Sequence, residues 1–244
     1  MFTYIVPVHN ESATLPDTMR RLDEARARYP IDRIIAVENG SRDDTWRVLQ
    51  QLATQYPAMR VFREPAAGIG HAYHRGIAEA LGALVPPAVT YLVLTAADLP
   101  FGFTDLASMV ALSPHPYVAI GSKAKLVGSV MPDRRRRVMS RIYQLARRAL
   151  IGMQTRDCQG SFVMHSDVAR RVHGAIRARD FFYTTELCAR LEHLGILPVE
   201  VEVELAREVR RSTVRPFKHG IAMFRQLVAL RRELATCDDR RADR

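Results

Sequence analysis

The sequence predicts a single α/β domain built on a doubly wound, mostly parallel sheet with flanking helices. Three observations predict this fold. Short apolar runs alternate with helical stretches through the first hundred residues, polar or glycine-containing loops follow the apolar runs, and no low-complexity linker divides the 244 residues. A composition of 48% hydrophobic and 25% charged residues suits one large core. Ligands of such sheets bind at the carboxyl ends of the strands.

The first half of the chain gives the clearest pattern. Apolar runs rich in β-forming residues predict strands, and the stretches between them predict helices. The strands are expected at residues 2–8, 33–37, 59–62 and 91–94, and the helices at about 12–29, 45–56 and 71–84.

The second half is less regular. Strands are expected at 118–121, 162–164 and 197–203, and helices at 133–150, 186–194 and 217–234. We therefore expect one domain over residues 1–215, followed by an amphipathic helix and a polar tail over residues 216–244.

Charge and cysteine content limit the function classes. The net charge of +10 favours an anionic partner, such as nucleic acid, an anionic membrane surface or phosphorylated small molecules, although a solvated basic face is the alternative. Cys158, Cys188 and Cys237 form no CxxC pair, which disfavours a zinc site or a disulfide framework. There is no secretory signal pattern and no apolar run of about 18 residues, so we expect a cytoplasmic protein with only peripheral membrane contact.

Polar side chains follow successive predicted strands. Asn10 and Glu11 follow the first strand, Glu38 follows the second, and Asp98 follows the fourth. Carboxylate and amide groups accept hydrogen bonds from ribose hydroxyls and base imino groups, although a loop acid is often only a helix cap. Their shared position predicts a nucleotide site at one edge of the sheet.

A glycine-containing loop follows the third strand. Gly68 and Gly70 suit a turn that cradles phosphate. A dinucleotide-binding motif would instead follow the first strand, with an acid about 20 residues later, which disfavours a dehydrogenase. Asp98 suits a divalent cation that bridges a diphosphate, with a turn or cap aspartate as the alternative.

Two predicted helices are both basic and amphipathic. In the first, arginines 134–137, 141, 147 and 148 flank the apolar residues Val138, Ile142, Leu145, Ala149, Met139, Tyr143, Ala146 and Leu150. In the second, Ile221, Phe224, Leu227, Val228 and Leu234 lie beside Lys218, Arg225, Arg231 and Arg232. This pattern favours helices in a membrane interface, and packing on the core is the alternative. No helix-turn-helix, RNP or zinc signature is present, so no nucleic-acid partner is expected.

Seven short stretches carry a resemblance to a known family. Residues 7–11 match P-x-x-N-E, residues 37–45 match V-D-D-G-S-x-D-x-T, and residues 68–76 match G-L-G-x-A-Y-x-x-G. Residues 157–159 match D-x-Q, residues 185–187 match T-E-L, residues 198–201 resemble an E-V-P-V strand, and residues 210–212 supply basic residues and a serine. The stretches occur in the same order as in the family-2 glycosyltransferases of the GT-A fold, which the chain therefore resembles. Within them it is most similar to dolichol- or polyprenyl-phosphate mannosyltransferases and glucosyltransferases.

The resemblance implies an inverting hexosyltransferase. It would move a hexose, mannose foremost, from a nucleoside-diphosphate sugar to a polyprenyl phosphate at a membrane surface, with Mg²⁺ or Mn²⁺ as the cation. The acceptor phosphate is already an anionic nucleophile and needs little general-base help. The implied nucleotide-binding residues are Pro7, Asn10, Glu11, Glu38, Asn39, Gly68 and Gly70. The implied acceptor and phosphate residues are Lys123, Arg134, Arg137, Gln159 and Ser212, and the implied catalytic residues are Asp98, which is also the metal ligand, Arg210 and Arg211.

The chain departs from the family pattern at two places. The usual D-A-D-L-Q metal segment reads Ala96-Ala97-Asp98-Leu99-Pro100, and Glu38-Asn39 replaces the usual pair of aspartates. Three alternatives therefore remain open: a degenerate transferase-like protein that binds nucleotide or lipid, a UDP-glucose-dependent transferase, and a soluble transferase with another acceptor.

Overall fold

The computed structural model describes residues 1–83, 90–126, 134–206 and 216–242 and, within these, all side chains except those of 134–137, 216–221 and 237–242. Its strands are β1 (Phe2–Val8), β2 (Ile31–Asn39), β3 (Met59–Glu64), β4 (Tyr91–Leu94), β5 (Val118–Leu126), β6 (Ser161–His165) and β7 (Val199–Val203). Its helices are α1 (Leu15–Ala25), α2 (Thr45–Gln55), α3 (Ile69–Gly82), α4 (Thr104–Val110), α5 (Arg134–Ile151), α6 (Ser166–His173), α7 (Tyr183–His193) and α8 (Pro216–Ala242).

The described strands form one sheet in the order β3-β2-β1-β4-β6-β5-β7. The first four pair in parallel, with Pro7 opposite Val37 between β1 and β2. Strand β6 runs antiparallel to both β4 and β5, and β7 returns to a parallel pairing with β5. The expected mostly parallel α/β sheet is confirmed. The loops after β1, β2, β3 and β4 lie at one edge because those strands point the same way.

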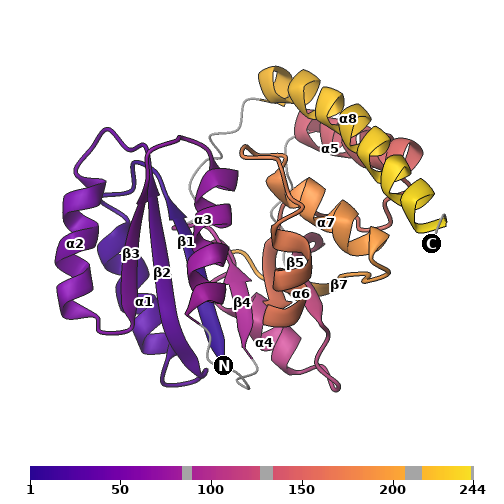
Figure 1. Ribbon diagram of the computed structural model, residues 1–244. Coiled ribbons are helices and arrows are strands. Elements are labelled where there is room, and N and C mark those ends of the chain that lie inside the picture. The colour runs from indigo at the N-terminus through magenta and orange to yellow at the C-terminus, as the bar shows by residue number, and fades with distance from the viewer. Residues whose placement is uncertain (84–89, 127–133, 207–215, 243–244) are drawn as a thin grey trace.

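Helices cover both faces of this sheet (Figure 1). Alternate side chains of β1 point to opposite faces, so Ile5 packs in one core cluster and Tyr4 in the other. The cluster around Ile5 includes side chains of α3, α6 and α7, whereas the cluster around Tyr4 includes those of α1, α2 and α4. Strands β1, β2 and β4 are therefore mostly buried on both sides, which explains their apolar runs, whereas the edge strand β3 is partly exposed.

Helices α5 and α8 lie side by side at the periphery and pack on α7 (Figure 1). The two apolar rows of α5 have different surroundings. Tyr143, Ala146 and Leu150 pack inward in a cluster with Leu227 and Leu230 of α8. The other row faces outward, where Val138, Ile142 and Leu145 are 55%, 54% and 67% exposed. Within the described residues, every helix is too short or too polar to span a bilayer.

Several elements differ from the sequence expectations. Helices α4 and α6 were not expected, because helices of seven and eight residues leave little periodicity to detect. Strand β5 is longer than expected and ends at Leu126, and α8 continues through the polar tail to Ala242.

Candidate active site

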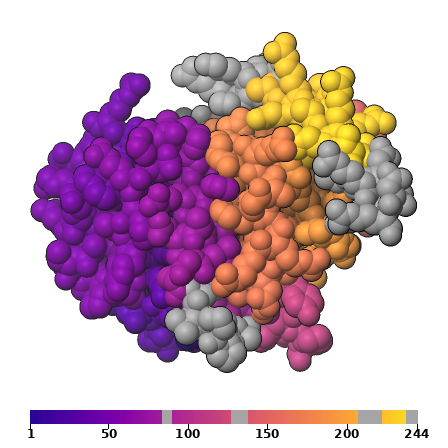
Figure 2. Space-filling model, in the orientation of Figure 1, coloured from indigo at the N-terminus to yellow at the C-terminus, as the bar shows by residue number. Residues whose placement is uncertain are grey.

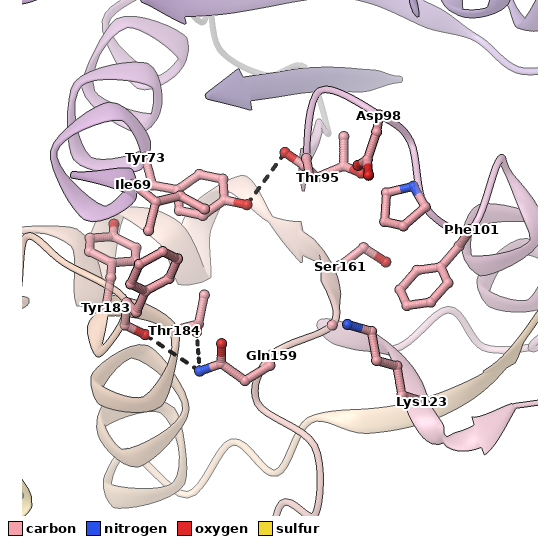
Figure 3. Close-up of a pocket in the computed structure, with 14 residues that line it drawn as sticks. Ile69, Tyr73, Thr95, Asp98, Phe101, Lys123, Gln159, Ser161, Tyr183 and Thr184 are labelled. Atoms are coloured by element: carbon pink, nitrogen blue, oxygen red, sulfur yellow. Dashed lines mark hydrogen bonds between the residues drawn. The ribbon is translucent and has the colours of Figure 1, made fainter. Parts of the chain in front are cut away.

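A pocket with a cavity volume of about 210 Å³ lies between the end of β4 and the beginning of β6 (Figure 3). Because β6 is antiparallel to β4, Leu94 at the end of β4 pairs with Phe162 near the beginning of β6. The lining comprises Ile69, Tyr73, Thr95, Ala96, Asp98, Pro100, Phe101, Lys123, Gln159, Gly160, Ser161, Phe181, Tyr183 and Thr184. Three predicted site residues thus meet here: Asp98, Lys123 and Gln159.

Asp98 lies in a tight loop after β4. The next residue, Leu99, is fully buried and has a φ of 46°, a left-handed conformation that is uncommon outside glycine. Two side chains of α1 hold the loop: the Thr18 hydroxyl donates to the Ala97 carbonyl at 2.5 Å, and the Arg21 guanidinium donates to the Asp98 carbonyl at 3.4 Å. The backbone is therefore fixed from behind while the Asp98 side chain lines the pocket.

Tyr73 forms the α3 side of the pocket. Its hydroxyl donates to the Thr95 carbonyl at 3.4 Å (Figure 3). Burial raises the pKa of Tyr73, and the nearby Asp98 carboxylate raises it further. The phenol therefore stays neutral at physiological pH and acts as a hydrogen-bonding wall.

Lys123 and Gln159 are organised by one carboxylate. Asp157 accepts from the Lys123 amide at 2.7 Å with one oxygen and from the Gln159 amide at 2.9 Å with the other. The Gln159 side-chain amide donates at 3.4 Å to both the Phe181 carbonyl and the Thr184 hydroxyl (Figure 3). Asp157 itself is thus a structural residue that places two polar groups at the cavity.

The turn at residues 155–158 is held from α5 by a buried arginine. Arg147 is 3% exposed, and its guanidinium donates to the carbonyls of Thr155 and Arg156 at 3.3 and 2.7 Å and to the Cys158 sulfur at 3.0 Å. Burial raises the pKa of Cys158, although the neighbouring guanidinium opposes this shift. Helix α5 is therefore tied directly to the segment that carries Gln159.

A buried acid lies beneath the pocket. Asp105 of α4 is 3% exposed and accepts a short hydrogen bond from the Ser161 hydroxyl, which lines the cavity. Burial raises the pKa of Asp105, whereas the hydrogen bonds from Ser161 and the Leu106 amide lower it in part.

The loops after β1 and β2 are joined to each other. Asn10 has a φ of 54°. Its side-chain oxygen accepts from the Arg42 backbone amide at 2.8 Å, and its backbone amide donates to the Ser41 hydroxyl at 3.0 Å. The Glu11 amide donates to the Thr45 hydroxyl at 2.9 Å. These contacts give the predicted nucleotide loops a fixed relative position, at the same edge of the sheet as the end of β4 but outside the pocket lining.

Glu38 and Asn39 have different environments. Glu38 is 1% exposed and faces Arg63 across the β2–β3 register. One Glu38 oxygen accepts from the Ser41 amide at 2.5 Å and the other from the Arg63 guanidinium at 3.0 Å. Asn39 is 3% exposed, and its side-chain amide forms no hydrogen bond with another described residue. Of this pair, only Asn39 has an uncommitted polar side chain within the described structure.

Gly68 and Gly70 lie against the backbone of residue 179. A Cβ at Gly68 would lie 2.5 Å from the Arg179 carbonyl oxygen, and Gly68 has a φ of 139° that side chains rarely adopt. The Arg179 carbonyl also accepts from the His71 amide at 3.1 Å. The two glycines are therefore required for close packing of the 177–179 segment on the N-terminus of α3, which the sequence pattern did not reveal.

Other predicted residues lie wholly or partly outside the described structure. Arg210, Arg211 and Ser212 lie outside the described residues, and the side chains of Arg134 and Arg137 are likewise not described. Pro7 is a buried residue of β1 near the sheet edge. The roles assigned to these six positions stay predictions, as do those assigned to the other predicted site residues.

The pocket offers few ligands for a cation. Asp98 is the one acidic residue of its lining, and no cluster of three or more histidine, cysteine or acidic side chains suited to a metal occurs among the described residues. A hard cation wants about six oxygens, so Asp98 fits such a cation only together with ligand oxygens.

Comparisons with known proteins identify the family. The model for "Glycosyl transferase family 2" matches residues 3–172. The dolichol-phosphate mannosyltransferase of Pyrococcus furiosus is 33% identical over 78 residues, which cover 32% of this chain and 22% of that protein. The undecaprenyl-phosphate 4-deoxy-4-formamido-L-arabinose transferase of Pseudomonas savastanoi pv. phaseolicola is 30% identical over 122 residues, or 48% of this chain and 34% of that protein.

Solved structures show the same fold. Glucosyl-3-phosphoglycerate synthase from Mycobacterium tuberculosis in complex with phosphoglyceric acid has a TM-score of 0.63 at 19% identity, covering 96% of this chain and 79% of that chain. The same enzyme with Mn²⁺, UDP and glucosyl-3-phosphoglycerate has a TM-score of 0.62, covering 94% and 78%. The chain spans about a quarter to a third of the length of the curated relatives. The family match spans most of the chain and agrees with the resemblance read from the motifs. The chain therefore belongs to glycosyl transferase family 2 and has the GT-A fold.

Proposed function

We propose that the protein transfers a hexose from a nucleoside-diphosphate sugar to a polyprenyl phosphate, with inversion, while docked peripherally on an anionic membrane surface at the cytoplasmic side. One observation carries the acceptor assignment. Helix α5 exposes an apolar row through Val138, Ile142 and Leu145, and Arg147 of the same helix holds the turn that leads to Gln159 at the pocket. A helix with an exposed apolar row is therefore tied directly to the segment that reaches the pocket, an arrangement that suits a lipid acceptor.

The chemistry follows from the charges around the pocket. A phosphate acceptor brings its own nucleophilic oxygen, so the protein must mainly align the two substrates and offset the charge of the leaving diphosphate. Lys123 and Gln159 are suited to hold the acceptor phosphate, because both line the cavity and both are placed by Asp157. Arg134, Arg137, Arg210, Arg211 and Ser212 are proposed to add further contacts to phosphate.

Asp98 is the proposed cation ligand. A bound Mg²⁺ or Mn²⁺ would supply charge neutralisation at the diphosphate, and relatives of the fold were solved with Mn²⁺ and UDP. The loop behind Asp98 is held by Thr18 and Arg21, so the Asp98 carboxylate has a fixed backbone behind it although Ala96 replaces the family's first aspartate. Asn10, Glu11, Gly68 and Gly70 are proposed to surround the nucleotide.

A second candidate donor is favoured by Asn39. Mannose transfer from a guanine nucleotide is the first candidate from the resemblance, yet guanine presents two adjacent donors, which suit a carboxylate. Uracil presents one N–H beside a carbonyl, and an amide can accept from the first and donate to the second. Each Glu38 oxygen already accepts a hydrogen bond, from Ser41 or from Arg63. Asn39 is therefore the residue of this pair proposed to contact the base, which supports UDP-glucose as the alternative.

The deciding experiment supplies polyprenyl phosphate with labelled GDP-mannose, UDP-glucose and related donors, with and without Mg²⁺ or Mn²⁺. Radiolabelled lipid product confirms the proposal and identifies the donor. Transfer only to a water-soluble acceptor such as a phosphoglycerate would favour the soluble-acceptor alternative. Nucleotide binding without transfer to any acceptor would identify a degenerate transferase.

A further inference from the structure

Residues 177–184 form a wall segment between the pocket and the C-terminal helix. In the space-filling view, the part of the chain that contains α6 and α7 fills the boundary between the N-terminal half and α8 (Figure 2). On the inner side, Phe181, Tyr183 and Thr184 line the pocket, and the Arg179 backbone packs on Gly68 and Gly70. Any shift of this segment would therefore change both the pocket and the glycine turn.

A buried carboxylate fixes the beginning of the wall segment. Glu186 of α7 is 3% exposed and accepts from the Ala178 amide at 2.7 Å and from the Arg177 amide at 3.1 Å. It also accepts from the Arg190 guanidinium at 2.7 Å, four residues along the same helix. This pair is self-contained, since each buried charge has its partner within α7.

Helix α8 adds a second set of polar ties from the outer side. Glu233 accepts from Arg190 at 2.9 Å and from Arg177 at 3.4 Å. About two turns earlier in α8, the Gln226 side-chain amide donates to one Asp180 oxygen at 3.0 Å, and the other Asp180 oxygen accepts from the Phe182 backbone amide at 2.9 Å. Glu233 and Gln226 therefore hold both ends of the stretch 177–182.

These ties are not needed to balance a buried charge. Arg190 retains Glu186 when Glu233 is removed, and the Glu233 side chain is 35% exposed. The contacts of Leu227 and Leu230 with Phe182 and Ala189 also keep α8 in place. Loss of the polar ties should therefore alter the position of the wall segment more than the stability of the fold.

We propose that Glu233 and Gln226 of α8 are positioning residues that press the wall segment onto Gly68 and Gly70 and thereby set the affinity for the nucleoside diphosphate. This inference rests on the proposed function, because it takes the N-terminal end of α3 as the diphosphate side of the site. It gives the C-terminal helix a role in donor binding in addition to its proposed place beside the membrane.

The test uses the full chain and compares Glu233→Gln, Gln226→Ala and the double variant with wild type. Calorimetric titration with UDP and with GDP, in the presence of Mg²⁺, should give a dissociation constant three- to tenfold higher for the double variant. In turnover assays the donor KM should rise by a similar factor while kcat is retained. Thr236→Ala is the matched control, because among the described residues its exposed hydroxyl donates to the Glu233 carbonyl of its own helix alone.

Leu230→Ala distinguishes a positioning role of the polar ties from a general effect of packing α8 on the protein. Leu230 is 3% exposed in the same helix and acts through apolar packing. If Leu230→Ala weakens nucleotide binding as much as the double variant at an equal loss of melting temperature, α8 is only a cover and the inference is overturned. Wild-type affinity in the double variant also overturns it. Wild-type protein that binds neither nucleotide would overturn the proposed function and the inference with it.

Discussion

Gly70 and Arg179 are in direct backbone contact, and a Cβ on Gly70 would lie 2.5 Å from the carbonyl carbon of Arg179. Backbone cannot yield as the end of a side chain can, so Gly70→Ala must push the 177–179 segment away from α3. We expect a loss of about 1–3 kcal/mol in the free energy of unfolding, as for other overpacked sites. Nucleotide affinity should fall as well.

Gly82→Ala is the matched control for that change. Gly82 ends the same helix, and a Cβ there meets nothing within 4 Å. Because alanine is the better helix former, this variant should be neutral or more stable by up to about 1 kcal/mol. Chemical denaturation of both variants measures the difference, and equal stabilities would show that the close approach to Arg179 is readily relieved.

Asp98 should be needed for transfer. It is the one acid of the pocket lining, so Asp98→Ala should lower kcat by about 10²–10³-fold, the cost typical of losing a group that stabilises transition-state charge. With a single carboxylate, Mn²⁺ should bind the free protein weakly and the complex with nucleoside diphosphate more tightly. Calorimetry with and without the nucleotide checks this.

A gain-of-function variant gives the converse test at the same loop. Ala96→Asp restores the family's first aspartate to the pocket lining and should strengthen Mn²⁺ binding. If Asp98→Ala transfers sugar at the parental rate, Asp98 serves only as a turn residue, and arginine and lysine side chains alone must offset the diphosphate charge.

The outward row of α5 should contribute to membrane binding. Burial of a whole isoleucine side chain contributes about 1.5–3 kcal/mol. Ile142 is 54% exposed, so a membrane can add only about half of this, and Ile142→Gln should weaken vesicle binding up to about tenfold without lowering the melting temperature. Replacing Arg134 to Arg137 with glutamine should also weaken binding to anionic vesicles, as should high salt. Sedimentation with vesicles rich in anionic lipid measures both.

Val110→Gln is the control for the membrane experiment. Val110 is 39% exposed at the end of α4, away from α5 and α8, so its replacement should leave vesicle binding unchanged. Equal binding by Ile142→Gln and wild type would assign the outward row to another surface contact and not to a membrane.

His74 should make stability depend on pH. Its ring stacks on His173 at a centroid distance of 4.0 Å, and burial lowers its pKa to about 4, with contributions from His173, Arg179 and His71. In the unfolded chain the His74 pKa is near 6.5. Between about pH 6.5 and pH 4, His74 is therefore protonated in the unfolded chain and neutral in the folded chain. The stabilising contribution is present above about pH 6.5 and is lost progressively as the pH falls through 4.

His74→Phe keeps a stacking ring and removes the titration. Its melting temperature should fall less than that of wild type between pH 6.5 and pH 4.5, with both proteins measured in the same buffers. His173 has its own pKa lowered by burial and by Arg179, so the residual slope of the variant reports mainly that group. Parallel curves for the two proteins would contradict the assignment to His74.

The sequence was sufficient for the parallel half of the fold. Strands such as β1 and β2 are buried on both faces, so their apolar runs are continuous and their ends coincide with polar loops. The reversed strand β6 and the short helix α4 were harder to foresee, because strand direction and short helices leave no periodic signal.

The candidate site was also foreseen only in part. Asp98, Lys123 and Gln159 were predicted and line one pocket, whereas the contributions of Tyr73 and Phe181 depend on how α3 and the wall segment meet. The engagement of Glu38 by Arg63 follows from β2–β3 register, which no spacing in the sequence specifies. Local patterns identified strand-end residues, and tertiary packing decided which of them remain available.

The direction of β6 has a consequence for how the pocket can be rebuilt. One side of the pocket comes from residues 69–101, around the end of β4. The other side comes from residues 123–184, around the beginning of β6, so each side is supplied by one continuous part of the chain. A chimera joined in the loop between α4 and β5 would exchange the Lys123, Gln159 and Thr184 wall and keep the Tyr73 and Asp98 wall. With the roles proposed above, such a chimera would exchange the acceptor contacts at a single crossover and leave the Asp98 contacts to the donor in place.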